Sequence, residues 1–379
     1  MANILTDLAA DIYKGADIVG RELVGGIPSA TINSDASLRA AQNDIVRSHK
    51  TREATLNSNV APSMTIPEGD DQTVDNLTLS LDKKESVQIP WTGEDVRHVN
   101  NGSGFETIFG DQISQAMRTL VNKMEKDLLV EAYQNASRAV GSAGTTPFST
   151  NFDSIADLRK ILVDNGMPTD GQSTLVIDTA AGAKLRNLAQ LQRANEAGNE
   201  QLLRQGTLLD LQGLMIKESA GVASHTAGGG SSYQVNDASL SKGDTTIAVD
   251  TGSGSIVKGD VVTIANHDYV VATDLSGGSF TINRPGLVED VADNASVTVA
   301  ANRTANVAFH RGALELAMRP IAMPNGGDAA VDQMTVQDPN SGLVFQINAY
   351  KGYQKAMFDI SALYGTKAWK DEFIAGLNG

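Results

Sequence analysis

Several residue types and motifs on which enzymes depend are scarce or missing in this sequence. There is no cysteine, which excludes disulfides, cysteine–zinc sites, thiolate nucleophiles and cysteine-ligated iron–sulfur clusters. The five histidines lie at least 42 residues apart, so no helical pair of zinc ligands exists. Phosphate-binding loops, dinucleotide-binding glycine motifs and nucleophile elbows are missing as well. We therefore predict that the chain is not an enzyme and has no catalytic residue, no cofactor and no metal site.

Positive charge and long apolar runs are also scarce. The 30 lysines and arginines are outnumbered by 45 aspartates and glutamates, which gives a net charge of −15 and argues against a general nucleic-acid binder. No apolar run reaches the length of about 18 residues that a membrane span needs. Asp7 and Asp11 stand where a signal peptide would have a basic start and an apolar run. We expect a protein that is made in a cytoplasm and has no membrane partner.

The clearest helical pattern lies in residues 105–140. Apolar residues recur there at steps of mostly three and four, and Gly141 and Gly144 follow. A helix of about 30 residues spans roughly 45 Å, much longer than the average helix. We expect this helix to be a backbone against which other layers pack.

Alternating apolar residues predict an extended β-hairpin shortly before this helix. Leu77, Leu79 and Leu81 alternate with polar residues, as do Val87, Ile89 and Trp91 in residues 87–91. The charged residues 82–86 between the two runs suit a turn. Each strand offers few apolar residues, so the hairpin needs a neighbour to cover it.

Residues 150–222 predict an α/β unit, with a helix over 154–164 and a buried strand over 174–177. After residue 303 the sequence predicts a strand over 306–309, a helix over 310–319 and two apolar strands over 343–347 and 355–360.

Residues 226–303 differ in composition from the rest of the chain. They contain ten glycines, nine acidic and four basic residues, and hence a net charge of −5. Six short β-rich runs follow one another, separated by turn residues: 233–235, 245–249, 261–264, 269–272, 280–282 and 297–299. This spacing predicts a small closed β-barrel, inserted into the host domain through a Gly/Ser linker.

Three segments carry a resemblance to a known family. They are Lys258–Ala265, Asn306–Leu314, and Leu363-Tyr364-Gly365 with Phe373. In the order polar arm, hairpin, long helix, α/β unit with β insert and C-terminal strands, the chain resembles the major capsid (coat) protein of tailed bacteriophages. This family has the Hong Kong-type capsid fold, and the chain is similar to its podovirus-like branch with an inserted β-barrel domain. The resemblance covers most of residues 60–379.

The resemblance implies an α+β fold in seven parts. These are an N-terminal arm (1–61), an extended β-hairpin loop (62–98), a peripheral domain with the spine helix (99–149), an axial α/β domain (150–225), the inserted β-barrel (226–303), the rest of the axial domain (304–327) and the peripheral C-terminal strands (328–379).

The resemblance also implies a function. The chain would be a structural subunit that self-assembles through a procapsid into the icosahedral head of a tailed phage. Its partners would be further copies in pentameric and hexameric capsomers, a scaffolding protein and a portal protein. The head would enclose double-stranded DNA without sequence-specific binding. The protein would be assembled in the host cytoplasm and found in the virion capsid.

Two groups of residues are candidate contacts. On the expected hairpin, Lys83, Lys84, Glu85 and Trp91 are candidates for contacts between subunits, although Lys83 and Lys84 also suit a solvated turn. In the expected arm, Asp7, Asp11, Asp17 and Glu22 suit a basic scaffold tail, although the arm also suits an ordinary packed helix.

Two other functions stay open at this point. The chain also fits another phage-particle component whose barrel binds a receptor or glycan, although Tyr233, Tyr269 and Phe280 are few aromatic residues for sugar stacking. An enzyme with an acidic site would use pairs such as Asp70–Asp71 or Glu289–Asp290. Solvated loop charge is the simpler interpretation of these pairs.

Overall fold

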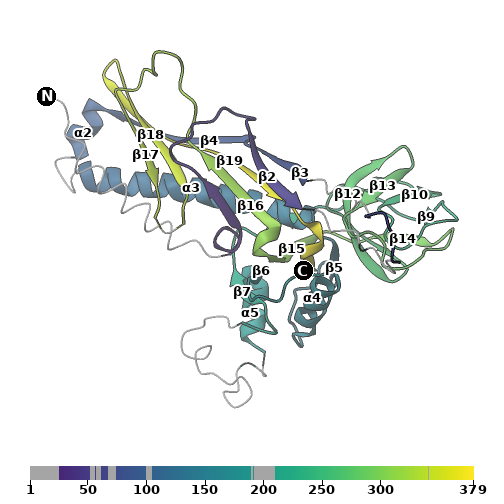
Figure 1. Cartoon of the computed structure of the whole chain (residues 1–379). Coiled ribbons are helices and arrows are strands. Elements are labelled where there is room, and N and C mark those ends of the chain that lie inside the picture. Colours follow the sequence, from purple (N-terminus) through teal and green to yellow (C-terminus); the bar gives the residue numbers. More distant parts are fainter. Residues whose placement is uncertain are drawn as a thin grey trace.

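A computed structural model describes residues 25–51, 56, 61–66, 74–99, 105–188, 191, 210–339 and 341–379. Within them the chain is a mixed α/β protein with few helices and many strands, as predicted. Figure 1 shows one long helix lying along a sheet, a small β unit at one end and a third projection with two shorter helices. Within the described part, no helix combines the length and the apolar character needed to cross a membrane. Asp7, Asp11, Asp17 and Glu22 lie outside the described residues.

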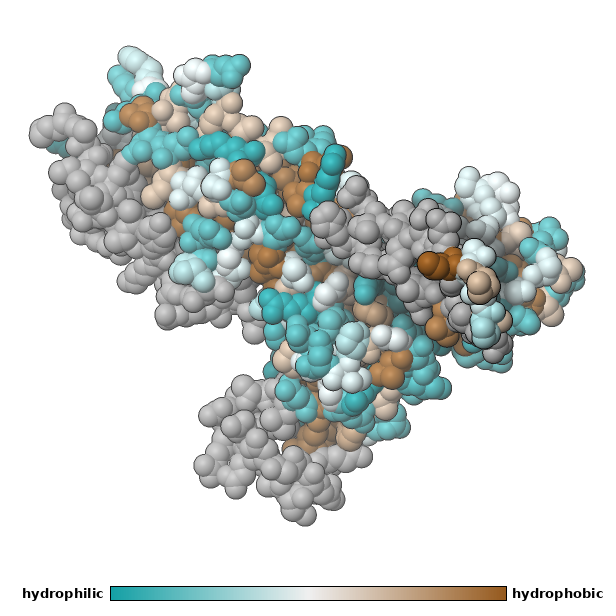
Figure 2. All heavy atoms as spheres, viewed as in Figure 1, coloured by the Kyte–Doolittle hydropathy of each residue, from teal (hydrophilic) through white to brown (hydrophobic). Residues whose placement is uncertain are grey.

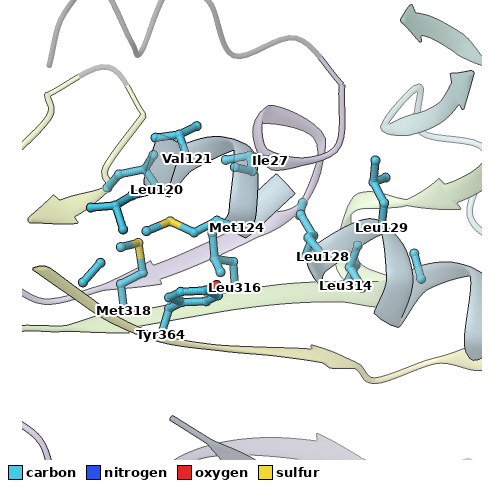
Figure 3. Packing of buried hydrophobic residues seen from close by; sticks show 14 of the residues in the cluster. Ile27, Leu120, Val121, Met124, Leu128, Leu129, Leu314, Leu316, Met318 and Tyr364 are labelled. Atoms are coloured by element: carbon cyan, nitrogen blue, oxygen red, sulfur yellow. The ribbon is translucent and has the colours of Figure 1, made fainter. Parts of the chain in front are cut away.

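The long helix α3 (Phe105–Gln134) packs on a six-stranded sheet. The sheet consists of β1 (Thr31–Ser34), β4 (Lys83–Thr92), β16 (Leu314–Arg319), β17 (Asp332–Gln337), β18 (Val344–Gly352) and β19 (Lys355–Ala368). In Figure 3 the α3 residues Met124 and Leu128 face Leu316 and Tyr364 of the sheet. The apolar stripe that predicted this helix is therefore the face that the sheet covers.

The helix ends earlier than expected because the following residues pair in a sheet. Residues 138–140 form β5 (Arg138–Val140), which runs parallel to β20 (Ile374–Asn378). The Ser137 amide donates to the Ile374 carbonyl oxygen at 2.9 Å. A tertiary partner therefore competes with the last helical turn.

A second set of strands forms the base of the third projection. The strands run in the order β5, β20, β15 (Arg303–His310), β6 (Ser173–Ile177) and β7 (Met215–Glu218). The helices α4 (Asp153–Asp164) and α5 (Thr179–Arg186) contribute Leu158 and Leu185 to the same buried core as Leu175 and Ile177. The predictions of a helix over 154–164 and a strand over 174–177 are confirmed.

Six strands within residues 233–299 pair in a closed order, β11-β14-β9-β10-β13-β12, with β12 returning to β11. We call this unit the six-stranded ring. Its strands are β9 (Tyr233–Val235), β10 (Thr246–Asp250), β11 (Val261–Ile264), β12 (His267–Ser276), β13 (Ser279–Ile282) and β14 (Ser296–Val299). The ring has its own apolar core, which includes Val235, Ile247 and Phe280. Each of the six short runs in the sequence therefore corresponds to a strand.

The predicted hairpin over residues 77–91 is wrong. β3 (Val74–Ser80) pairs with β2 (Ile45–Thr51) in a separate two-stranded ribbon, whereas β4 pairs with β19. The alternating pattern located both strands, but alternation does not identify a strand's partner. Leu79 and Leu81 pack with Leu363 at the root of the ribbon.

The predicted helix over residues 310–319 is also wrong. After a short 3₁₀ turn (Arg311–Ala313) the chain forms β16, which lies between β1 and β19. Leu314 and Leu316 join the core under α3, whereas Ala317 packs with Leu79 on the other face. Because β16 is buried on both faces, its sequence lacks the alternation of polar and apolar residues that marks a strand. Its residues are good helix formers, and the prediction therefore favoured a helix.

Gly365 allows the ribbon to cross the sheet at close range. A Cβ atom at this position would lie 2.1 Å from the Ser80 carbonyl oxygen and 2.8 Å from Leu79 Cδ2. We expect Gly365→Ala to lower the free energy of unfolding by about 2 kcal/mol, because backbone must move. Gly93→Ala is the matched control, since nothing lies within 4 Å of its added Cβ. If urea unfolding gave the same loss of stability for both variants, the prediction would be contradicted.

Candidate functional site

The described residues contain no group of three or more histidine, aspartate or glutamate side chains that could hold a metal ion. A groove of about 500 Å³ lies between β4 and α3, lined by residues 87–90 and by α3 residues between 108 and 119. Among the described residues that line the groove, Asp111 is the one ionisable side chain. These residues therefore offer apolar contact and a few amides.

Apolar side chains are exposed where the ribbon extends from the body. Ile45 at the start of β2 is 58% exposed, and in the segment joining β2 to β3 the values are 85% for Leu56, 104% for Met64 and 90% for Ile66. Over the face shown in Figure 2, hydrophobic residues are interspersed among polar ones. The described part of this connecting segment therefore carries three almost fully exposed large apolar side chains, and exposed apolar groups of this kind are typical of surfaces that bind a partner.

The four hairpin candidates lie on β4 and alternate in direction. The Lys83 ammonium lies 3.5 Å from Asp127 Oδ2 and 3.3 Å from the Thr366 hydroxyl, so it contacts its own chain. Trp91 is only 7% exposed, and its indole nitrogen donates to Gln112 Oε1 at 3.0 Å. Lys84 is exposed and Glu85 is half-buried. Of these four residues, only Lys84 is exposed.

Asp127 on α3 binds the sheet through a hydrogen bond from Tyr364. The Tyr364 hydroxyl donates to Asp127 Oδ2 at 2.8 Å, and the Lys123 ammonium donates to Oδ1 at 2.7 Å. Burial and the neighbouring Asp127 carboxylate raise the pKa of Tyr364. Burial alone would raise the pKa of Asp127, but the bonds from Lys123 and Tyr364 lower it. This pair therefore holds α3 at one position along β19.

Glu125, two residues before Asp127, holds three parts of the chain together. Its carboxylate accepts from the Gly26 amide at 2.7 Å, the Ile27 amide at 2.8 Å and the Ser219 hydroxyl at 2.9 Å. The side chain is 6% exposed, and burial raises the pKa of Glu125 despite these bonds. The sequence offered one signal: at helical spacing Glu125 falls between Val121 and Leu129 on the apolar face. A charged residue there needs buried donors.

A second buried polar cluster joins the six-stranded ring to α3. His225 Nε2 lies 2.8 Å from Asp260 Oδ1, and His225 Nδ1 lies 3.3 Å from the Tyr133 hydroxyl. Arg303 donates to the Gly259 carbonyl oxygen, and burial lowers the pKa of Arg303 to about 10. In the part of the chain that the structure describes, no metal-ligand set surrounds this histidine. No pattern in the sequence pointed to this cluster, because its members are far apart in the chain.

The aromatic side chains of the ring are buried. Exposure is 7% for Tyr233, 0% for Tyr269 and 1% for Phe280, and all three belong to the ring's core. Stacking on a sugar requires an exposed aromatic face, so these three residues do not favour a glycan-binding role.

Comparisons with known proteins found similarity in structure alone. No protein-family model matches the sequence, and no curated protein matches it. A structure from Mycobacterium phage Che8 is 16% identical, covering 89% of this chain and 85% of that chain, with a TM-score of 0.47. The mature capsid of bacteriophage PhiM1 is 12% identical, with 92% and 85% covered and a TM-score of 0.49. The capsid of the cyanophage P-SCSP1u is 11% identical, with 92% and 86% covered and a TM-score of 0.49.

Proposed function

We propose that the chain is the major capsid protein of a tailed bacteriophage and self-assembles into the icosahedral head that encloses double-stranded DNA. The observation that carries this proposal is the segment joining β2 to β3, in which Leu56, Met64 and Ile66 are 85–104% exposed. Large apolar side chains in water become stabilising once a neighbour covers them, by about 1.5–3 kcal/mol each. A shell made of many copies supplies such neighbours for every subunit.

We assign the parts of the proposed capsid subunit to elements of the fold as follows. The ribbon and its connecting segment, residues 45–80, are proposed as the extended loop, in place of 62–98. α3 with its sheet would be the peripheral domain and its spine helix, and the α4–α5 projection the axial domain around capsomer centres. The six-stranded ring would be the inserted β-barrel domain. Lys84, exposed on β4, remains a candidate contact between subunits.

The proposed partners are further copies in pentamers and hexamers, a scaffolding protein and a portal protein. The net charge of −15 suits a container, because a wall that bound DNA tightly would hinder packaging and release. Assembly in the host cytoplasm through a procapsid belongs to the same proposal.

The test is the assembly state of the full chain, with and without a scaffold. We expect electron microscopy and sedimentation velocity to show shells, tubes or capsomers for the wild type. Met64→Ser combined with Ile66→Ser should raise the concentration needed for assembly at least tenfold, since two apolar contacts per subunit weaken. Val331→Ser is the control, because Val331 is 59% exposed beside β17, away from the ribbon. A wild-type chain that stays monomeric at high concentration with scaffold would overturn the proposal.

A further inference from the structure

The chain enters and leaves the ring at a single place, and one strand of the ring, β12, also pairs with β5 of the body, with Tyr269 opposite Arg138. The chain enters the ring through β8 (Ser224–His225) and leaves it through β15, and these two strands pair, with His225 opposite Arg303. Two adjacent strands alone would form a hinge, because the ring has its own core and its own closed strand order. The orientation of the ring therefore depends on contacts that cross this hinge. They include the β12–β5 pairing, the packing of Val261 and Val270 in the core under α3, and the polar side chains described next.

Polar side chains cross the hinge and are almost entirely buried. Asp260 is 0% exposed, Arg303 5%, His225 6% and Tyr133 7%. Asp260 also accepts from the Val257 amide at 2.8 Å and from the Gly228 amide at 3.2 Å. The carboxylate is thus held by backbone of the ring and its linker, and it presents one oxygen to His225.

With Asp260 ionised and His225 neutral, this chain of hydrogen bonds has one direction. A carboxylate only accepts, so His225 Nε2 carries the proton that lies between it and Asp260. In the neutral imidazole, Nδ1 is then an acceptor, and the Tyr133 hydroxyl donates to it. One continuous series runs from α3, through the linking strand, to the ring.

A second contact ties the ring to the end of the same helix. Asn283, which follows β13, donates from Nδ2 to the Gln134 carbonyl oxygen at 3.0 Å and to the Ala136 carbonyl oxygen at 2.8 Å. These oxygens lie at and just past the C-terminal end of α3, where backbone carbonyls lack partners within the helix. Gly259 permits close approach, since a Cβ there would lie 3.1 Å from the Tyr133 ring and 3.2 Å from His225.

We propose that Tyr133, His225, Asp260 and Asn283 form a joint that fixes the orientation of the six-stranded ring relative to α3, and so sets the angle at which the ring meets neighbouring copies. The fixed orientation of the ring is inferred from geometry alone. The effect on the angle to neighbouring copies rests on the proposed capsid function. Tyr133 and Asn283 are positioning residues: they hold the ring and do not need to touch a neighbour themselves.

The absence of cysteine makes a direct test simple. Cysteines introduced as Lys126→Cys on α3 and Lys242→Cys in the ring, both at exposed positions, accept a pair of spin labels. Double electron–electron resonance on the unassembled chain then measures the distance distribution between ring and helix. We expect one narrow distribution in this labelled background. Adding Tyr133→Phe, or Asn283→Ser as a second variant, should broaden it at least twofold.

Tyr233→Phe is the matched control, because the Tyr233 hydroxyl donates to the Gly254 carbonyl oxygen inside the ring and crosses no hinge. A distribution as narrow in both joint variants as in the control overturns the joint. A broader distance distribution in the joint variants, together with shells of mixed size, supports both the joint and its role in assembly. Broadening with shells of wild-type size retains the joint and overturns its role in assembly. A labelled wild type that forms no shells counts against the capsid function and leaves the distance result standing.

Discussion

Replacing Glu125 by leucine is expected to lower the free energy of unfolding by about 3 kcal/mol. The Gly26 amide, the Ile27 amide and the Ser219 hydroxyl would each lose a buried acceptor. An unsatisfied buried donor costs about 1–3 kcal/mol, and removing a carboxylate that is unfavourably buried offsets part of the sum. Urea unfolding gives the change, and hydrogen exchange should show that the segment around Ile27 loses protection first.

Glu131→Leu on the same helix is the control for this prediction. The Glu131 carboxylate accepts a single, longer bond of 3.3 Å from the Ala368 amide. We expect a loss of about 1 kcal/mol there. If Glu125→Leu is no more destabilising than Glu131→Leu, the three bonds to Glu125 do not hold the N-terminal segment on α3.

Asp371→Asn is expected to stabilise the chain at neutral and alkaline pH by about 2 kcal/mol. Burial and the nearby Glu372 raise the pKa of Asp371 from 3.8 to about 6, although Arg284 and Lys367 act against this rise. The folded state therefore binds a proton more tightly than the unfolded state does. This contribution favours folding at low pH and is lost as the pH rises through about 6. The asparagine variant carries no such charge, so its stability should not fall over this interval.

Asp237→Asn provides a control of opposite sign. The amide and the hydroxyl of Ser239 lower the pKa of Asp237, so its contribution is present at neutral pH and lost on acidification. Thermal unfolding between about pH 4 and 8 should separate the two variants. If the stability of the wild type and that of Asp371→Asn changed with pH in parallel, the prediction would be contradicted.

Local patterns predicted the elements that are specified by their own apolar spacing and turn residues. The apolar faces of α3 and α4 and the short runs of the ring each specify one element through spacing and turn residues. Pairing was predicted poorly, because β3 and β4 both alternate and the sequence does not say that their partners are β2 and β19. The partner of β4 lies far along the chain: Lys83 pairs with Tyr364, 281 positions away.

The buried polar contacts could not be predicted for the same reason, because their partners lie far apart in the sequence. Glu125 and Ser219 are 94 positions apart, and Tyr133 and His225 are 92 positions apart. A carboxylate on an apolar helix face needs buried hydrogen-bond donors, but the sequence does not identify the residues that supply them. The exposed apolar side chains Met64 and Ile66 were equally hidden, because exposure is a property of the fold.

The position of β20 has a consequence for synthesis. This strand, the last in the sequence, lies between β15 and β5 in the middle of its sheet, and it contributes Ile374 and Leu377 to two buried cores. The body therefore cannot complete its sheet while β20 is still inside the ribosome. The ring, whose strands lie within residues 233–299, has all its pairing partners available much earlier. A nascent chain stalled shortly before β20 should hold a folded ring beside a body whose central strand is missing. The apolar surface of this body would stay open to chaperones until β20 emerges.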